Sequence, residues 1–154
     1  MAENRKVIEG LNGLLADGTV FYQKLRHYHW NVGGRDFFTL HVKFEELYTA
    51  WSITLDEMAE RILMLGGVPL HTLASLLQRA ELEEDESIPA AADMVDALLA
   101  DLTALRERAS AVIDASEAAG DRSTANLLDA AYDAMDKDAW MLSAWKKEAA
   151  KSWN

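Results

Sequence analysis

Proline is scarce in this chain, and the two prolines that occur stand at either end of one segment. Pro69 and Pro89 are the only prolines among 154 residues, whereas Ala, Leu, Glu and Lys, which favour helices, are abundant. Proline interrupts both helices and central strands, so its positions mark where regular elements end. The composition disfavours a strand-rich fold and favours long helices.

Four long segments place apolar residues at intervals of three and four residues, which is the spacing of one face of an α-helix. Glycine-containing breaks separate these segments, at Gly33-Gly34, Gly66-Gly67-Val68-Pro69 and Gly120-Asp121. Glycine followed by proline is a typical helix stop. We expect helices from about Asn4 to His29, from Phe37, capped by Asp36, to Leu65, from just after Pro89 to Ala118, and from just after Asp121 to Ala150.

The connector at about 70–88 lies between helices that are too long to be joined by a tight hairpin. Its apolar residues Leu73, Leu76 and Leu77 predict a short helix that crosses the bundle. Four helices with one long connection are typical of a ferritin-like bundle. The expected fold is therefore all-α, a ferritin-like four-helix bundle with a short helix between helices two and three, in a single domain over residues 1–154.

The second predicted helix carries two separate stripes. With His41 set at 0°, one apolar stripe falls at roughly 240–320° and is predicted to face the core. A second line, at about 0–100°, is polar and includes the small residues Thr49 and Ser52, which would let another helix approach closely. The apolar stripe is Leu40, Phe44, Leu47, Trp51, Leu55, Met58 and Ile62, and the candidate ligands on the second line are His41, Glu45, Asp56 and Glu60.

The length of this helix prevents one chain from gathering all four candidate ligands at one metal. His41 and Asp56 are fifteen residues apart, which is about 22 Å along a straight helix. Two copies crossing antiparallel about a twofold axis would place Asp56 and Glu60 of one copy near His41 and Glu45 of the other. His29 ends the first helix, and a hairpin returns it beside His41.

This set of imidazoles and carboxylates suits iron(II) or manganese better than a closed zinc site. Taken one at a time, the same residues also fit a solvated helix face and a structural histidine. The chain has no Glu-x-x-His pair, so a di-iron site inside one bundle is excluded, and a site would have to lie between chains. His27 and His71 are assigned no ligand role.

Charge is unevenly distributed along the chain, whose formal net charge is −11. Residues 1–80 hold nine acidic and eight basic residues, and residues 81–154 hold seventeen acidic and seven basic residues. A surface of this sign disfavours wholesale binding to DNA or anionic membranes and suits cations. No apolar run approaches the ~18 residues of a membrane span, cysteine is absent, and the first residues lack an apolar signal segment, so we expect a cytoplasmic protein.

Two long spaced motifs surround the candidate ligands. The first is His29-Trp30-Asn31-Val32-Gly33-Gly34 followed by Leu40-His41 and Glu45. The second runs from Leu55-Asp56-Glu57-Met58-Ala59-Glu60-Arg61 through Leu65-Gly66-Gly67 to Pro69. These motifs, together with Gly120-Asp121, Thr124-Ala125, Asp136-Lys137 and Trp140 in the last helix, resemble those of the Dps family, the mini-ferritins named as DNA-binding proteins from starved cells.

The resemblance implies a hollow dodecamer with ferroxidase sites at its dimer interfaces. It places His29, His41 and Glu45 of one subunit, with Asp56 and Glu60 of its partner, on the di-iron ligand positions. It further implies oxidation of Fe(II), typically by hydrogen peroxide with oxygen as the other oxidant, storage of ferric mineral, and protection against oxidative damage. Trp30 is a candidate radical quencher, with packing beside the hairpin as its other role.

The iron-entry pore and the family's DNA binding are where this sequence departs from its better-known relatives. The resemblance places pore acids early in the last helix, where Asp121 matches, Asn126 stands where Asp is frequent, and Asp129 follows a turn later. The family's DNA binding is attributed to a basic tail, whereas only Arg5 and Lys6 precede the first helical apolar residue, and the C-terminal Lys146, Lys147 and Lys151 are few. We therefore expect no DNA binding, and the alternatives are a nucleoid DNA-binding protein with secondary iron chemistry and a structural oligomer with a degenerate site.

Overall fold

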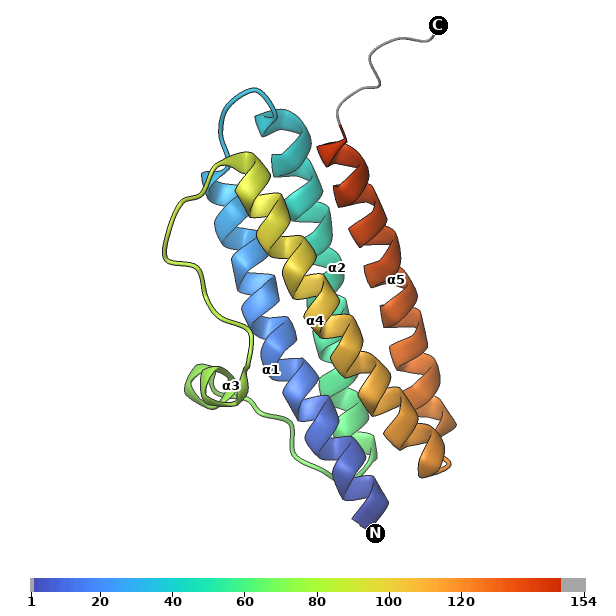
Figure 1. Cartoon of the computed structure of the whole chain (residues 1–154). Coiled ribbons are helices and arrows are strands. Elements are labelled where there is room, and N and C mark those ends of the chain that lie inside the picture. The colour runs from blue at the N-terminus through green and yellow to red at the C-terminus, as the bar shows by residue number, and fades with distance from the viewer. Residues whose placement is uncertain (1, 148–154) are drawn as a thin grey trace, which may run out of the picture.

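Four long helices pack side by side in the structure, a computed structural model that describes residues 2–147. The elements are α1 (Ala2–Asn31), α2 (Phe37–Met64), α3 (Leu73–Arg79), α4 (Ala91–Ala118) and α5 (Arg122–Lys146), and this range contains no strand. Helices α1 and α2 form one antiparallel pair, and α4 and α5 form the other (Figure 1). The all-α four-helix arrangement with a short helix in the long connection is confirmed.

The connector runs back along the outside of α1 and brings the chain from the end of α2 to the start of α4 (Figure 1). Helix α3 begins with a capping box in which the Ser75 backbone amide donates to Oγ1 of Thr72 at 3.1 Å. Asp17, a fully buried residue of α1, accepts hydrogen bonds from the backbone amides of Glu81 and Leu82 at 2.7 and 2.9 Å. This carboxylate therefore fixes the connector to the bundle just after α3 ends.

The core contains most of the apolar residues that the helical spacing placed inward. In α2 six of the seven stripe residues are buried, and Leu55 is half-buried. In the other long helices, the apolar residues at three- and four-residue spacing are largely buried. Leu11, Leu15, Leu25, Val95, Leu98, Leu102, Leu105, Val112, Leu128, Met135 and Leu142 are buried, Ile8, Tyr22, Ile113 and Trp145 are partly buried against the core, and Ala131 is half-buried. No helix in residues 2–147 is long and apolar enough to cross a membrane.

Several helix ends differ from the sequence prediction. Helix α1 extends two residues further at each end than predicted. Asp36 occupies the N-cap position of α2, but its side chain makes no capping hydrogen bond. Helix α5 ends at Lys146 because Lys147 adopts an extended backbone (φ −65°, ψ 126°), so the prediction of a helix to Ala150 is wrong at this end. Ala150 and Lys151 lie outside the described residues.

Candidate metal centre

His29 and His41 lie face to face where α1 ends and α2 begins. Their ring centroids are 3.8 Å apart, and the ring planes differ by 16°. The chain reverses between them over 32–36, where Gly34 has φ +86°, a left-handed conformation that glycine adopts without strain. The short glycine-containing reversal therefore brings together two histidines twelve residues apart, as the sequence predicted.

Each of these histidines forms a hydrogen bond with the backbone carbonyl group of the other. Nδ1 of His29 is 2.7 Å from the carbonyl oxygen of His41, and Nδ1 of His41 is 2.7 Å from the carbonyl oxygen of His29. A carbonyl can only accept, so each Nδ1 carries a proton and donates it. In a neutral imidazole the lone pair is then on Nε2, which is the arrangement found in metal-binding histidines with an outer hydrogen bond.

The three candidate carboxylates are exposed along α2. Glu45 lies one turn after His41, whereas Asp56 and Glu60 are four and five turns along the same helix. In the part of the chain that the structure describes, no three His, Asp or Glu side chains come together as a metal site. One chain thus brings together His29 and His41, and does not bring Asp56 or Glu60 to them.

Relatives of known sequence match nearly the whole chain. The Ferritin-like domain family matches residues 8–151. A DNA protection during starvation protein of Brevibacillus brevis is 43% identical over 135 residues, which cover 88% of this chain and 91% of that protein. A DNA protection during starvation protein 2 of Bacillus anthracis is 39% identical over 142 residues, covering 92% and 97%.

Solved structures of Dps proteins share the fold of this chain. A Dps protein from Bacillus brevis matches with a TM-score of 0.93 and 40% identity, over 96% of this chain and 99% of that one. The chain belongs to the Dps family. A second Dps protein, from Vibrio cholerae O1, matches with a TM-score of 0.92 and 35% identity, over 95% and 92%, and is described as a member of a superfamily of ferritin-like diiron-carboxylate proteins.

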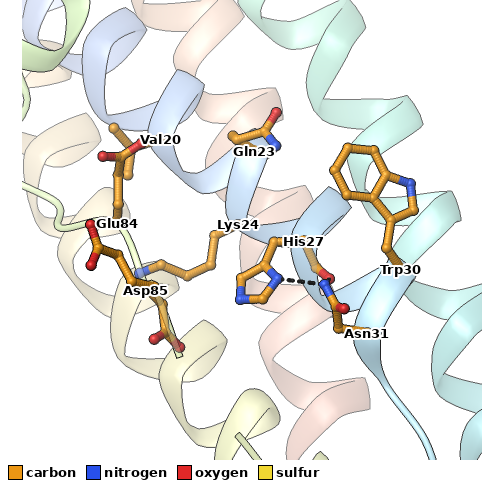
Figure 2. A pocket seen from close by; sticks show the side chains of 9 residues that line it. Val20, Gln23, Lys24, His27, Trp30, Asn31, Glu84 and Asp85 are labelled. Atoms are coloured by element: carbon orange, nitrogen blue, oxygen red, sulfur yellow. Dashed lines mark hydrogen bonds between the residues drawn. The ribbon is translucent and has the colours of Figure 1, made fainter. Parts of the chain in front are cut away.

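Trp30, the residue after His29 in the sequence, is exposed on the surface of α1. Its side chain is 56% exposed, and the guanidinium of Arg26 lies 4.8 Å from its ring centroid. It borders an open pocket of about 450 Å³ between α1 and the connector (Figure 2). In this view Trp30 and the acidic residues Glu84 and Asp85 lie on opposite sides of the pocket. The quencher role stays a prediction.

His27, one of the two histidines that were assigned no ligand role, borders the same pocket and forms a hydrogen bond with the connector. Its Nε2 is 2.7 Å from the carbonyl oxygen of Ser87, and its Nδ1 is 2.9 Å from Nδ2 of Asn31. Both ring nitrogens are therefore engaged in hydrogen bonds within the chain. His71 is exposed, and its Nδ1 is 3.0 Å from the carbonyl oxygen of Pro69.

The three candidate pore residues occupy two different environments. Asp121 caps α5, and its buried side chain forms an ion pair with Arg61 at 2.7 Å. Burial raises the pKa of the Asp121 carboxyl, but hydrogen bonds from Thr124 and the charge of Arg61 outweigh burial, so its pKa lies below the usual value. Asn126 and Asp129 are exposed on α5. The pore assignment stays a prediction.

Two aromatic residues that contact the histidine pair were missed in the sequence. Phe37 stacks on His41, and the rings of Tyr48 and His29 meet nearly at right angles. The spacing of four residues between Phe37 and His41 was a signal for the first contact, since such residues share a helix face. The contact of Tyr48 joins two helices and has no comparable local signal.

Proposed function

We propose that this Dps chain oxidises Fe(II), preferably with hydrogen peroxide, at sites shared between two subunits, and stores the ferric product in a hollow oligomer. The main support is the stacked pair His29 and His41, whose Nδ1 atoms are hydrogen-bonded to backbone carbonyl oxygens, which leaves Nε2 as the nitrogen that could bind a metal. Family membership supports an iron-binding, protective role. A dodecamer and a cytoplasmic location are the assembly and site of action that we propose with it.

The available donors fit iron as the substrate. Two imidazole nitrogens and carboxylates suit Fe(II), and negatively charged carboxylates favour the higher charge of Fe(III) over that of Fe(II). The reacting groups would be His29, His41 and Glu45 of one subunit with Asp56 and Glu60 supplied by a second copy. Oxidation of a pair of Fe(II) ions supplies both electrons that hydrogen peroxide needs to become water, so no hydroxyl radical is released.

The length of α2 supports sharing between subunits. His41 and Asp56 are about 22 Å apart along a straight helix, further than any single metal site extends. A second copy in antiparallel orientation supplies the missing carboxylates, and the twofold axis then generates two identical sites. This arrangement uses every candidate ligand on α2 and needs no rearrangement of the four-helix bundle.

The activity is tested by loading the assembled protein with Fe(II) without oxygen and then adding hydrogen peroxide. We expect a ferric absorbance and about two Fe(II) consumed for each peroxide, as a two-electron reaction requires. A parallel reaction with oxygen measures the preference for peroxide. Absence of ferric product with either oxidant would contradict the proposal.

Subunit mixing tests the shared site. A dimer of one His41→Ala and one Asp56→Ala subunit has one site with both halves intact, so random mixing should restore roughly a quarter of the sites. Mixing His41→Ala with Glu45→Ala is the matched control, because both substitutions damage the same half and no site is restored. Equal activity in the two mixtures would show that the site is not shared as proposed.

We propose no DNA-coating function for this chain, although several of its relatives are named DNA protection during starvation proteins. The support for this choice is electrostatic. The net charge is −11, and in the part of the chain that the structure describes Lys24 and Arg61, both largely buried, are paired with carboxylates. A chain with this net negative charge is expected to repel the phosphate backbone of DNA.

A further inference from the structure

Four rings form a continuous column through the histidine pair. Phe37 stacks on His41 with centroids 4.7 Å apart and planes 24° apart. His41 stacks on His29 at 3.8 Å, and Tyr48 meets His29 edge-to-face with centroids 5.3 Å apart and planes at 81°. Each imidazole therefore has one face against the other imidazole, and each contacts one additional aromatic ring.

The hydrogen bonds of the imidazoles do not by themselves fix the rings. A histidine ring can rotate by 180° about its terminal torsion, which exchanges its nitrogens with carbons and turns Nε2 away from a metal. The Nδ1 bond of His41 opposes this rotation, but water can replace a carbonyl acceptor at a half-exposed ring. A ring packed against the face of His41 keeps water away and gives the imidazole no space to turn.

We propose that Phe37 and Tyr48 are positioning residues that hold the two imidazoles in the orientation that binds metal. Phe37 acts on His41 and Tyr48 acts on His29, and neither supplies a ligand. The inference rests on the proposed function, because it assigns these rings a role at the same site. It also explains why an aromatic residue occupies the first turn of α2, where packing against the core is only partial.

Substitution of Phe37 tests one end of the column, with Co(II) alone as the probe and the assembled oligomer as the sample. Phe37→Leu keeps an apolar side chain but removes the stacked ring, and we expect about three- to tenfold weaker Co(II) binding. Phe37→Tyr keeps the ring and should bind Co(II) as the wild type does. Phe38→Leu is the comparison variant: Phe38 is 81% exposed and stacks on neither histidine, but its ring contacts Phe37 at 5.3 Å, so it should weaken Co(II) binding less than Phe37→Leu does.

Tyr48 provides the same comparison at the other end, so the test does not depend on one variant folding. Tyr48→Phe keeps the edge contact with His29 and should leave Co(II) affinity unchanged, whereas Tyr48→Leu removes the contact and should weaken binding by a similar factor. Equal Co(II) affinity in wild type, Phe37→Leu and Tyr48→Leu would overturn the proposal. Binding that is weaker in Phe38→Leu than in Phe37→Leu, or weaker in Tyr48→Phe than in the wild type, would overturn it as well.

Nitrogen NMR of the metal-free oligomer, labelled only in its four histidines, supplies a readout that general destabilisation does not move. We expect the wild type to show the Nδ1–H form alone for His29 and His41, and Phe37→Leu to show a mixture of forms at His41. A single unchanged form in Phe37→Leu would refute the positioning role. If the wild type binds no Co(II), the proposed iron site fails, and the NMR comparison still decides the role of the rings.

Discussion

Replacing Asp121 would test whether its carboxylate holds the end of α2 against the start of α5. Oδ1 of Asp121 accepts from Nη2 of Arg61 at 2.7 Å and from the backbone amide of Thr124 at 3.1 Å. Nε of Arg61 also donates to Oγ1 of Thr124 at 2.9 Å. Arg61 follows Glu60 directly, so this contact fixes the end of α2 that carries two of the proposed ligands.

The size of the effect follows from what each substitution removes. Asp121→Asn keeps a good capping side chain and removes the charge, which should lower the free energy of unfolding by about 1–1.5 kcal/mol, the difference between a charged and a neutral hydrogen bond. Asp121→Ala removes the cap and the partner of Arg61 together, and should cost about 2–4 kcal/mol. The side chain is only 8% exposed, so water replaces these bonds poorly.

The effect of Asp121 should also depend on pH. Its pKa lies below the usual value because the Thr124 hydrogen bonds and the Arg61 charge outweigh burial. A carboxyl with a lowered pKa in the folded state stabilises the protein above its unfolded pKa of about 3.9 and loses that contribution as the pH falls through the folded pKa. The difference between wild type and Asp121→Asn should therefore be constant from pH 5 to 7 and shrink below about pH 4.

Urea unfolding at one fixed subunit concentration measures these differences, because the stability of an oligomer depends on concentration. Asp129→Asn is the matched control, since Asp129 is exposed on the same helix, and its stability should equal that of the wild type. If Asp121 served only the predicted pore, Asp121→Asn would slow iron uptake and leave stability unchanged. That result at pH 7 would refute the structural role argued here.

Two further predictions concern the buried ion pair and the acidic surface. Lys24 and Asp101 pair at 2.7 Å with side chains only 8% and 12% exposed, so Lys24→Met should destabilise by about 3–5 kcal/mol and the double variant with Asp101→Leu should recover most of the loss. Burial raises the pKa of Asp101, so Lys24→Met should lose more unfolding free energy at pH 8 than at pH 5, as measured by urea unfolding. An equal loss at both pH values would argue against a buried uncompensated carboxylate. A gel-shift assay should show no retardation of DNA even at low salt, where phosphate contacts are strongest, and clear retardation would restore the DNA-coating alternative.

The fold was predictable because its helices depend on a repeating pattern. The apolar stripe of α2 falls within an arc of about 80°, and six of its seven residues are buried. Helix ends depend on single contacts, so they were less predictable. Asp36 and Asp121 both precede a helix in the sequence, but only Asp121 accepts a capping hydrogen bond from the helix backbone.

The histidine pair was predictable from connectivity, and its detailed geometry was not. A glycine-containing reversal after His29 leaves little choice in where His41 lies, so the sequence indicated the proximity. The exchange of Nδ1 bonds and the ring column depend on side-chain torsions across two helices, which no spacing rule contains. Tyr48 illustrates this limit, because its contact with His29 joins residues nineteen positions apart on different helices.

The exposed side of α2 combines residues that a solvated surface would not favour. Val42 and Ile53 are 52% and 59% exposed, and they lie on the same face as Glu45, Asp56 and Glu60. In the proposed antiparallel pair, the apolar residues gain a second helix to pack against, since contact removes them from water. The carboxylates of both copies are then brought together and repel one another unless positive charge is supplied. A metal cation at each proposed site would supply it, so the residues that favour subunit contact and those that would require a cation lie on one helix face.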